Sequence, residues 1–351
     1  MSTVETVKTK RDIRKLKPDE LKKFFVENGD KAFRAVQVDE WLWKKSAKNF
    51  DQMTNLSVAT RELLKENFSI NHIHVDKMQR STDGTIKNAV TLHDGLVVES
   101  VLIPAEKRIT ACVSSQVGCS LACKFCATAK LKRQRNLSAD EIYDQVVAIR
   151  EQAELFFNRP LTNIVFMGMG EPLLNYNNVI EAIDRITSPK GLGMALRRIT
   201  VSTVGIAKMI MKMADDGVKF NLAVSLHAAL DKTRSSIMPI NDSNPLNELA
   251  DALRYWYKKT KSKVTYEYVV WQGVNDTEEH AQALLEFCQV IPSKVNLIEY
   301  NAIGDEQFKQ ASDKVLNMYM DLLERNGITT RIRKSRGKDI DAACGQLANK
   351  S

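Results

Sequence analysis

The sequence lacks any apolar run of the ~20 residues that a membrane-spanning helix needs, so we expect no membrane anchor. Its first 15 residues are rich in Lys and Arg, and no apolar segment follows them, which argues against a secretion signal. Cysteine is also scarce, with 6 in 351 residues, and cytosolic proteins seldom depend on a disulfide framework. We therefore expect a cytoplasmic protein in which the spacing of the cysteines matters more than their number.

The composition is that of an ordinary globular protein, with 44% hydrophobic, 7% aromatic and 27% charged residues. Such values exclude disordered, collagen-like and coiled-coil chains. The length of 351 residues suits about two domains of ~150 residues each, or one large α/β domain with an appendage.

The net charge of +8 is concentrated in three basic clusters, which cover residues 8–17, 124–135 and 331–338. A single cluster of this kind is more often solvated surface than a binding site. Three clusters, two of them beside unusual cysteines, favour contact with RNA or DNA.

The N-terminal part of the chain predicts a small helical module. Pro18 and Gly29 are typical of the start and end of a first helix, and Ser57 fits the N-cap of a third one. Residues 73–104 alternate between apolar and polar and contain two Asp-Gly pairs, which are strong hairpin signals. We expect a helical domain at 1–72, a β-ribbon linker at 73–104 and an α/β domain at 105–351.

Strand-like and helix-like segments alternate through the rest of the chain. The expected strands are 109–114, 163–168, 198–203, 220–226, 263–270 and 294–299, and the expected helices are 138–154, 177–187, 205–216, 245–258, 277–290 and 307–326. Six such units in series predict an α/β fold in which parallel strands form a partial βα barrel. The chemistry of such barrels lies at the carboxyl ends of the strands.

Three cysteines, Cys119, Cys123 and Cys126, lie within eight residues on a loop after the first of these strands. A structural zinc site is one interpretation, although zinc generally takes four protein ligands and would need His72 or His74 as the fourth. Three thiols also suit a [4Fe–4S] cluster whose fourth iron stays open. An open iron can bind a small molecule through amino and carboxylate groups.

Further residues, most of them polar or small, end or follow four of the expected strands. They are Gly170 and Glu171, then Ser202, then Ser225, Leu226 and His227, and finally Asn301. Each residue alone is typical of a turn, and glycine at a strand end lets a ligand approach the backbone closely. Together they predict a polar ring on one rim of the barrel.

The CxxxCxxC spacing after the first strand of a βα barrel resembles the radical S-adenosylmethionine (SAM) enzymes. The resemblance implies that Cys119, Cys123 and Cys126 hold a [4Fe–4S] cluster and that the polar rim binds SAM. Gly170 and Glu171, in a GMGEP segment, would lie against the amino group of SAM.

Several longer stretches resemble the RlmN family of adenosine C2 methyltransferases. They are CVSSQVGC at 112–119, GMGEPLLNY at 168–176, STVG at 202–205, SLHA at 225–228, MPIN at 238–241, GVND at 273–276 and DIDAACGQL at 339–347. The helical N-terminal module resembles the RNA-binding accessory domain of that family in position and size. One departure is Ala129, where the family pattern has Gly.

This resemblance assigns catalytic roles to three residues. C2 of adenine is not nucleophilic, so a direct displacement on SAM fails, and the family uses two SAM molecules per turnover. Cys344 would carry the methyl group as S-methylcysteine, Cys112 would resolve the product through a transient disulfide with Cys344, and Glu99 would accept the C2 proton. From the sequence alone, Glu99 is only a carboxylate at an exposed strand position.

The resemblance also implies substrates and partners. These are an adenosine of 23S ribosomal RNA at the peptidyl transferase centre, an anticodon-loop adenosine of tRNA, and a low-potential electron donor such as flavodoxin, with the chain itself a monomer. Two alternatives remain open at this point. One is a Cfr-type enzyme that methylates C8, and the other is a non-catalytic, metal-containing RNA-binding protein.

Overall fold

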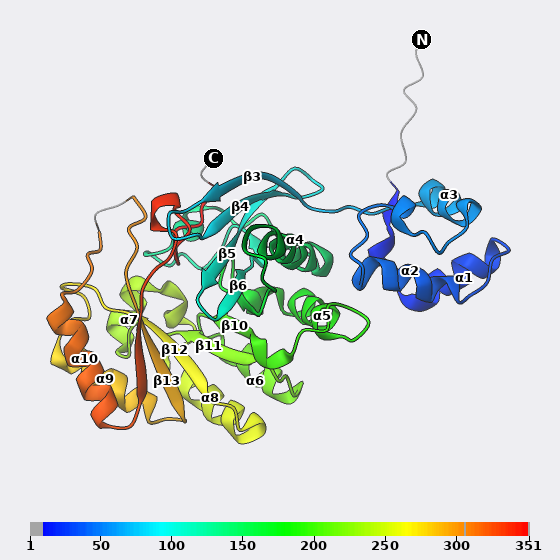
Figure 1. Cartoon of the computed structure of the whole chain (residues 1–351). Coiled ribbons are helices and arrows are strands. Elements are labelled where there is room, and N and C mark those ends of the chain that lie inside the picture. Colours follow the sequence, from blue (N-terminus) through cyan, green and yellow to red (C-terminus); the bar gives the residue numbers. More distant parts are fainter. Residues whose placement is uncertain (1–9, 305–306, 350–351) are drawn as a thin grey trace, which may run out of the picture.

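The computed structural model describes residues 10–304 and 307–349, so Lys8 of the first basic cluster lies outside the described residues. At its centre is one ten-stranded sheet with the strand order β14-β13-β12-β11-β10-β9-β6-β5-β4-β3. Helices lie around this sheet, and the first three helices form a separate N-terminal lobe at one side (Figure 1). No helix in the described parts of the chain combines the length and apolarity that a membrane crossing requires.

Parallel strands and the helices between them form the predicted partial barrel. The strands are β6 (Arg108–Cys112), β9 (Asn163–Phe166), β10 (Ile199–Thr203), β11 (Asn221–Ser225), β12 (Val264–Val269), β13 (Ser293–Ile298) and β14 (Thr329–Arg333), and each pairs in parallel with the next. The helices are α4 (Ala139–Phe157), α5 (Tyr176–Thr187), α6 (Ala207–Asp215), α7 (Asp231–Ile237), α8 (Leu246–Thr260), α9 (Glu278–Cys288) and α10 (Asp313–Arg325). The α/β fold prediction is confirmed, whereas α7 and β14 were not expected and α10 begins later than residue 307.

The two predicted hairpins form the antiparallel edge of the same sheet. Their strands are β3 (His74–Arg80), β4 (Ile86–Thr91) and β5 (Val97–Ala105). Gly84 and Gly95 of the Asp-Gly pairs have φ angles of +86° and +80°, a backbone conformation that glycine adopts without steric cost. Because β5 also pairs with β6, the ribbon continues directly into the barrel sheet.

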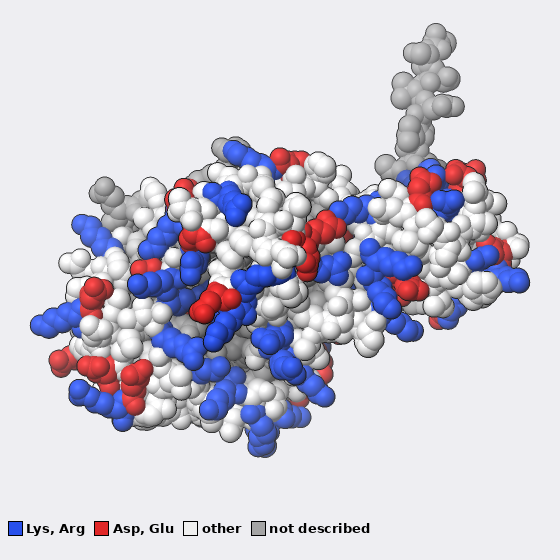
Figure 2. All heavy atoms as spheres, viewed as in Figure 1, with Lys and Arg blue, Asp and Glu red and all other residues white. Residues whose placement is uncertain are grey.

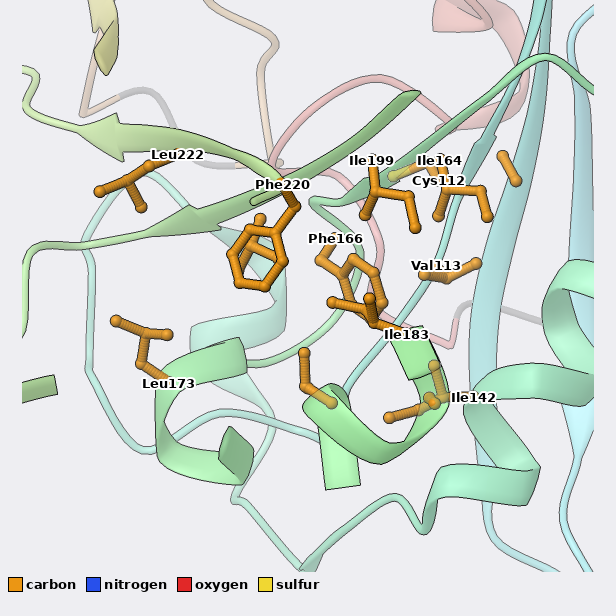
Figure 3. Packing of buried hydrophobic residues seen from close by; sticks show 14 of the residues in the cluster. Cys112, Val113, Ile142, Ile164, Phe166, Leu173, Ile183, Ile199, Phe220 and Leu222 are labelled. Atoms are coloured by element: carbon orange, nitrogen blue, oxygen red, sulfur yellow. The ribbon is translucent and has the colours of Figure 1, made fainter. Parts of the chain in front are cut away.

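Apolar side chains of the outer helices pack onto the parallel strands. Ile142 of α4 and Ile183 of α5 point toward Ile164 and Phe166 of β9, and all four are buried (Figure 3). These helices have apolar residues on one face, so packing that face on the sheet removes it from water. The core fixes the strands and therefore the position of the rim residues that follow them.

The N-terminal lobe contains α1 (Pro18–Glu27), α2 (Arg34–Trp43) and α3 (Val58–Asn67), joined by the short paired strands β1 (Arg11–Asp12) and β2 (Phe68–Ser69). The predicted caps are confirmed, since Pro18 begins α1 and the Ser57 hydroxyl accepts a hydrogen bond from Thr60 N at 3.1 Å. The lobe contacts α4, where the Tyr143 hydroxyl donates to the carbonyl of Trp43 at 2.6 Å.

Candidate active site

The predicted rim residues lie at the carboxyl ends of neighbouring parallel strands. Gly170 and Glu171 follow β9, and Asn301 follows β13. Ser202 in β10 and Ser225 at the end of β11 have hydroxyl oxygens 3.5 Å apart. The topology therefore brings these segments, which are far apart in the sequence, to one rim.

The three-cysteine loop lies between β7 (Gln116–Val117) and a single 3₁₀ turn (Ala127–Lys130), and β8 (Arg135–Asn136) pairs with β7 beyond it. Gly118 begins the loop with φ +73°, and a Cβ there would lie 2.6 Å from the Lys132 carbonyl oxygen, so only glycine fits. Ala129 lies in the 3₁₀ turn and is not among the residues with positive φ, so alanine is compatible with this turn.

The thiols of Cys119, Cys123 and Cys126 lie close enough to influence one another's ionisation. Burial raises the pKa of each thiol, and for Cys123 the charges of Cys126 and Cys119 raise it further. No three His, Cys, Asp or Glu side chains of the described residues gather closely enough to bind one metal ion. A cluster makes a different demand, because its cysteines bind separate irons. Its positive irons would also stabilise the thiolates that burial disfavours.

Neither His72 nor His74 is placed to be the fourth ligand of a zinc site. Both ring nitrogens of His72 are in use, since Nδ1 lies 3.0 Å from Asp144 Oδ2 and Nε2 lies 2.8 Å from the Ala47 carbonyl oxygen. His74 is exposed on β3 and lies 3.8 Å from Asp76. The three cysteines therefore fit a cluster better than a four-ligand zinc site.

Glu171 provides a buried carboxylate at the rim that lacks a cationic partner among the described residues. Its Oε1 accepts from Leu173 N at 3.0 Å and its Oε2 accepts from Val204 N at 2.9 Å. Burial raises the pKa of Glu171 to about 7 in spite of these hydrogen bonds. No charged side chain of the described residues contributes to this shift. A ligand ammonium group, such as that of SAM, would supply the missing positive charge.

Gly170 allows the backbone to pass close to the β7 segment. Its φ is +92°, and an added Cβ would lie 2.4 Å from Gln116 Cβ. We expect Gly170→Ala to destabilise the protein by more than the about 1–3 kcal/mol of a left-handed backbone alone. Gly273→Ala is the matched control, because Gly273 also has positive φ (+71°) but has no atom within 4 Å of its added Cβ. Equal decreases in the midpoint temperature of thermal unfolding in the two variants would show that the contact with Gln116 does not matter.

His227 is a neutral, buried side chain that packs against the cysteine loop. Burial, together with the nearby Arg234, lowers the pKa of His227 to about 3. Its Nδ1 accepts from Val269 N at 3.2 Å, which leaves the proton on Nε2, and the Phe125 ring meets it edge-on with centroids 4.8 Å apart. The preceding Leu226 is fully buried and is held through its backbone.

Asn301 connects the rim to the C-terminal segment that carries Cys344. Its Nδ2 donates to the Cys344 carbonyl oxygen at 3.2 Å, while its buried Oδ1 has no hydrogen-bond partner within the described parts of the chain. The next residue, Gly345, accepts at 2.7 Å from Ala127 N, which directly follows Cys126 of the cysteine loop. Cys344 itself is exposed. The structure therefore places Cys344 beside both the cysteine loop and the rim.

Cys112 is the second predicted catalytic thiol, and it is buried at the end of β6. In Figure 3 it lies beside Ile164. Burial, and to a smaller extent the charge of Cys344, raises the pKa of Cys112 to about 12. The nearby Arg333 lowers the pKa of Cys112. The pKa of Arg333 is itself raised, most strongly by the charge of Cys344.

The expected disulfide between Cys112 and Cys344 is wrong for this structure, in which all six cysteines are free thiols. A disulfide holds its two Cβ atoms about 3.8 Å apart. Here Cys112 is fixed in the sheet, whereas Cys344 is on an exposed segment with its own anchors.

Glu99 lies in β5 and is buried, not exposed as its sequence context indicates. Its Oε1 lies 3.2 Å from the ammonium group of Lys87. Its Oε2 accepts from Ala348 N at 2.7 Å and from Asn349 N at 3.1 Å, just beyond Cys344. The role of Lys87 could not be predicted from the sequence, because nothing in an alternating strand marks one lysine as buried.

Arg234 is a second residue that the sequence analysis missed. It lies fully buried in α7 and donates to four partners around the rim: Leu226 O at 3.1 Å, Asn241 Oδ1 at 2.7 Å, Val204 O at 2.5 Å and Ser225 O at 3.5 Å. It therefore holds the segment after β10 to the end of β11 and the residue that follows it. The only signal in the sequence was Asn241, which belongs to the MPIN stretch.

The basic clusters are divided between internal ion pairs and open surface. Arg14 is buried among carboxylates, and Arg135 pairs with Glu141 and Asp94. Lys124, Lys132 and Arg133 around the cysteine loop remain exposed. Lys and Arg outnumber Asp and Glu on the face that Figure 2 shows.

Two domain families match the chain. The Ribosomal RNA large subunit methyltransferase N-terminal domain matches residues 11–70, and the Radical SAM superfamily matches residues 113–287. The first match covers the N-terminal lobe, and the second begins just after β6 and includes the cysteine loop and most of the rim.

Full-length relatives carry the name "Probable dual-specificity RNA methyltransferase RlmN". The protein from Christiangramia forsetii is 66% identical over 97% of both chains. The protein from Flavobacterium psychrophilum is 67% identical over 97% of this chain and 98% of its own. The more distant protein from Salinibacter ruber is 42% identical over 99% of this chain and 96% of its own.

A solved structure has the same architecture over nearly the whole chain. It is described as the crystal structure of a radical SAM methyltransferase from Sphaerobacter thermophilus. It is 38% identical in sequence and superimposes with a TM-score of 0.90 over 96% of this chain and 99% of its own. With two matching domain families and relatives that are similar from end to end, this chain belongs to the RlmN family of radical SAM proteins.

Proposed function

We propose that this protein is a radical SAM RNA methyltransferase that methylates C2 of adenosine. The observation that carries the proposal is the docking of the Cys344 segment on the cysteine loop. Ala127 N donates to Gly345 O at 2.7 Å, and the Thr128 hydroxyl donates to Leu347 O at 2.6 Å. These bonds place an exposed thiol next to the loop whose cysteines fit a [4Fe–4S] cluster.

Cys119, Cys123 and Cys126 would hold the cluster, and the rim from Gly170 to Asn301 would hold SAM. When bound, the cluster and two SAM molecules per turnover supply a methyl group and a 5′-deoxyadenosyl radical. Glu171 would accept hydrogen bonds from the ammonium group of SAM, because it has no cation of its own among the described residues. The free Oδ1 of Asn301 would accept a further donor at the same rim.

Cys344 is the methyl carrier in this proposal. C2 of adenine is electron-poor and is not a nucleophile, so the protein must provide the nucleophilic atom. The Cys344 thiol is exposed, as a group that meets an RNA base must be, and its backbone is held by Asn301. Nucleophilic catalysis of this kind divides one difficult transfer into easier steps.

Glu99 and Cys112 would act after the methyl group has reached Cys344. We assign Glu99 to accept the C2 proton, since its carboxylate contacts the backbone four and five residues beyond Cys344. We assign Cys112 to a later step of turnover, because it lies at the carboxyl end of β6, the rim end of the sheet, and the charge of Cys344 contributes to its raised pKa.

RNA is the expected substrate, in line with the names of the relatives and with the exposed lysines around the cysteine loop. We propose adenosines of 23S ribosomal RNA and of tRNA, with the N-terminal lobe at 1–72 as an accessory RNA-binding domain. Recognition would depend on RNA shape and on extrusion of the target base from its stack. A low-potential donor such as flavodoxin would reduce the cluster.

The test is mass spectrometry of nucleosides from unmodified ribosomal RNA and tRNA. The RNA is incubated anaerobically with cluster-loaded protein, SAM and a reductant. We expect 2-methyladenosine. The appearance of 8-methyladenosine would reject C2 in favour of C8, and the absence of any methyladenosine from a protein that cleaves SAM would reject the RNA substrate.

A further inference from the structure

Cys344 lies on a C-terminal strap, residues 334–349, which has almost no regular structure of its own. Its only helical element is one 3₁₀ turn (Lys338–Ile340), so contacts with the rest of the protein must set its position. In Figure 1 the strap, in red, runs back toward the β3–β4 edge of the sheet. Its hydrogen bonds to other segments include Ser81 Oγ to Asp339 Oδ1, Gly337 N to Asp83 Oδ2, Ala127 N to Gly345 O, Asn301 Nδ2 to Cys344 O and Gln346 Nε2 to Ala302 O.

The most buried of these anchors is a pair of opposite charges in the antiparallel edge. Lys87 of β4 and Glu99 of β5 lie 3.2 Å apart, with only 4% and 2% of their side chains exposed. Glu99 uses its other oxygen for the amides of Ala348 and Asn349. Lys87 also donates to the Asp341 carbonyl oxygen at 3.5 Å. The pair therefore holds the strap on both sides of Cys344.

Lys87 is the only cation that pairs with Glu99 among the residues described by the structure. A buried carboxylate without a counter-charge is unstable, because solvent no longer stabilises its charge. Without Lys87, Glu99 would turn toward water or take up a proton. In either case the amides of Ala348 and Asn349 would lose a charged acceptor, and hydrogen bonds to charged groups are stronger than neutral ones.

We propose that Lys87 is a positioning residue that acts through Glu99 to hold the strap, and with it the Cys344 thiol, at the rim. This inference rests on the proposed function, which makes Cys344 the methyl carrier and Glu99 the proton acceptor. It also couples the two roles. When Glu99 accepts a proton, its hold on the two strap amides weakens, so proton transfer loosens the segment that carries Cys344.

Hydrogen–deuterium exchange of the full-length, cluster-loaded protein tests this inference without RNA or SAM. In Lys87→Met we expect the amides of Ala348 and Asn349 to exchange about tenfold faster or more, since each loses a charge-assisted bond. Lys87→Arg should restore slow exchange, because it keeps the charge. Lys77→Met is the matched control, because Lys77 is an exposed lysine on the neighbouring strand β3.

Unchanged hydrogen–deuterium exchange of the Ala348 and Asn349 amides in Lys87→Met would overturn the inference. So would an equal rise in peptides of the central strand β12, since that would make Lys87 a general stability residue. If Lys87→Met does not fold, Glu99→Gln takes its place, and unchanged exchange at the same two amides would overturn the inference equally. The exchange result and the proposed function can fail separately. If the Lys87 variants exchange as expected but the wild-type protein methylates no RNA, the proposed function is rejected and the role of Lys87 in holding the strap remains.

Discussion

Replacing Cys344 with Ala is expected to abolish adenosine methylation, with a loss of at least about 10³-fold. The variant removes the only nucleophile that the account provides for the methyl group. Cluster binding should be unaffected, because the strap contacts the cysteine loop through the backbone of Gly345 and Leu347 and not through the Cys344 side chain. Nucleoside mass spectrometry measures the loss, and iron and sulfide content measures the cluster.

Cys288→Ala is the control for this experiment. Cys288 is a buried residue of α9 whose thiol takes no part in the site, so methylation by that variant should stay close to the wild-type rate. Full methylation by Cys344→Ala would remove the methyl carrier from the account. Loss of iron together with methylation would instead make Cys344 a structural residue of the cysteine loop.

Replacing Arg14 with Met is expected to lower the free energy of unfolding by about 3–5 kcal/mol, the usual cost of breaking a buried ion pair. The Arg14 side chain is 1% exposed and lies 2.9 Å from Asp144, 3.2 Å from Asp12 and 3.3 Å from Asp140. Burial opposes its charge, but these three carboxylates raise the pKa of Arg14 above its ordinary value. Its loss would leave a group of buried negative charges where the N-terminal lobe meets α4.

Lys15→Met is the matched control for Arg14→Met. Lys15 also pairs with Asp140, but 41% of its side chain is exposed, and exposed ion pairs contribute at most about 1 kcal/mol. Trp41 and Trp43 lie in the lobe and report its unfolding by fluorescence. Similar shifts of the urea midpoint in the two variants would show that the buried network does not anchor the lobe.

The fold was predictable where local patterns and final structure agree. The Asp-Gly pairs became turns at Gly84 and Gly95, and the alternation of strands and helices gave the parallel sheet. Helix α7 was missed because it is short and mostly polar. Only two of its residues are buried, and one of them is an arginine, Arg234. Strand β14 was missed because TTRIR reads as part of a basic surface cluster.

The site was predictable where residue spacing carries the chemistry, as in the three cysteines and the GMGEP segment. Charge partners were not predictable. Arg14 lies 130 residues from Asp144, and Lys87 is one of many lysines, so only the folded chain shows that they neutralise buried carboxylates. The same limit explains why Glu99 was expected to be exposed: its cation and its strap amides come from other segments.

The most direct test of the account is the mass of the Cys344 peptide after cluster-loaded protein has been incubated with SAM. We expect that one methyl group is added to Cys344 and that none is added to Cys112 or Cys288. RNA methylation by a protein whose Cys344 never carries a methyl group would contradict it.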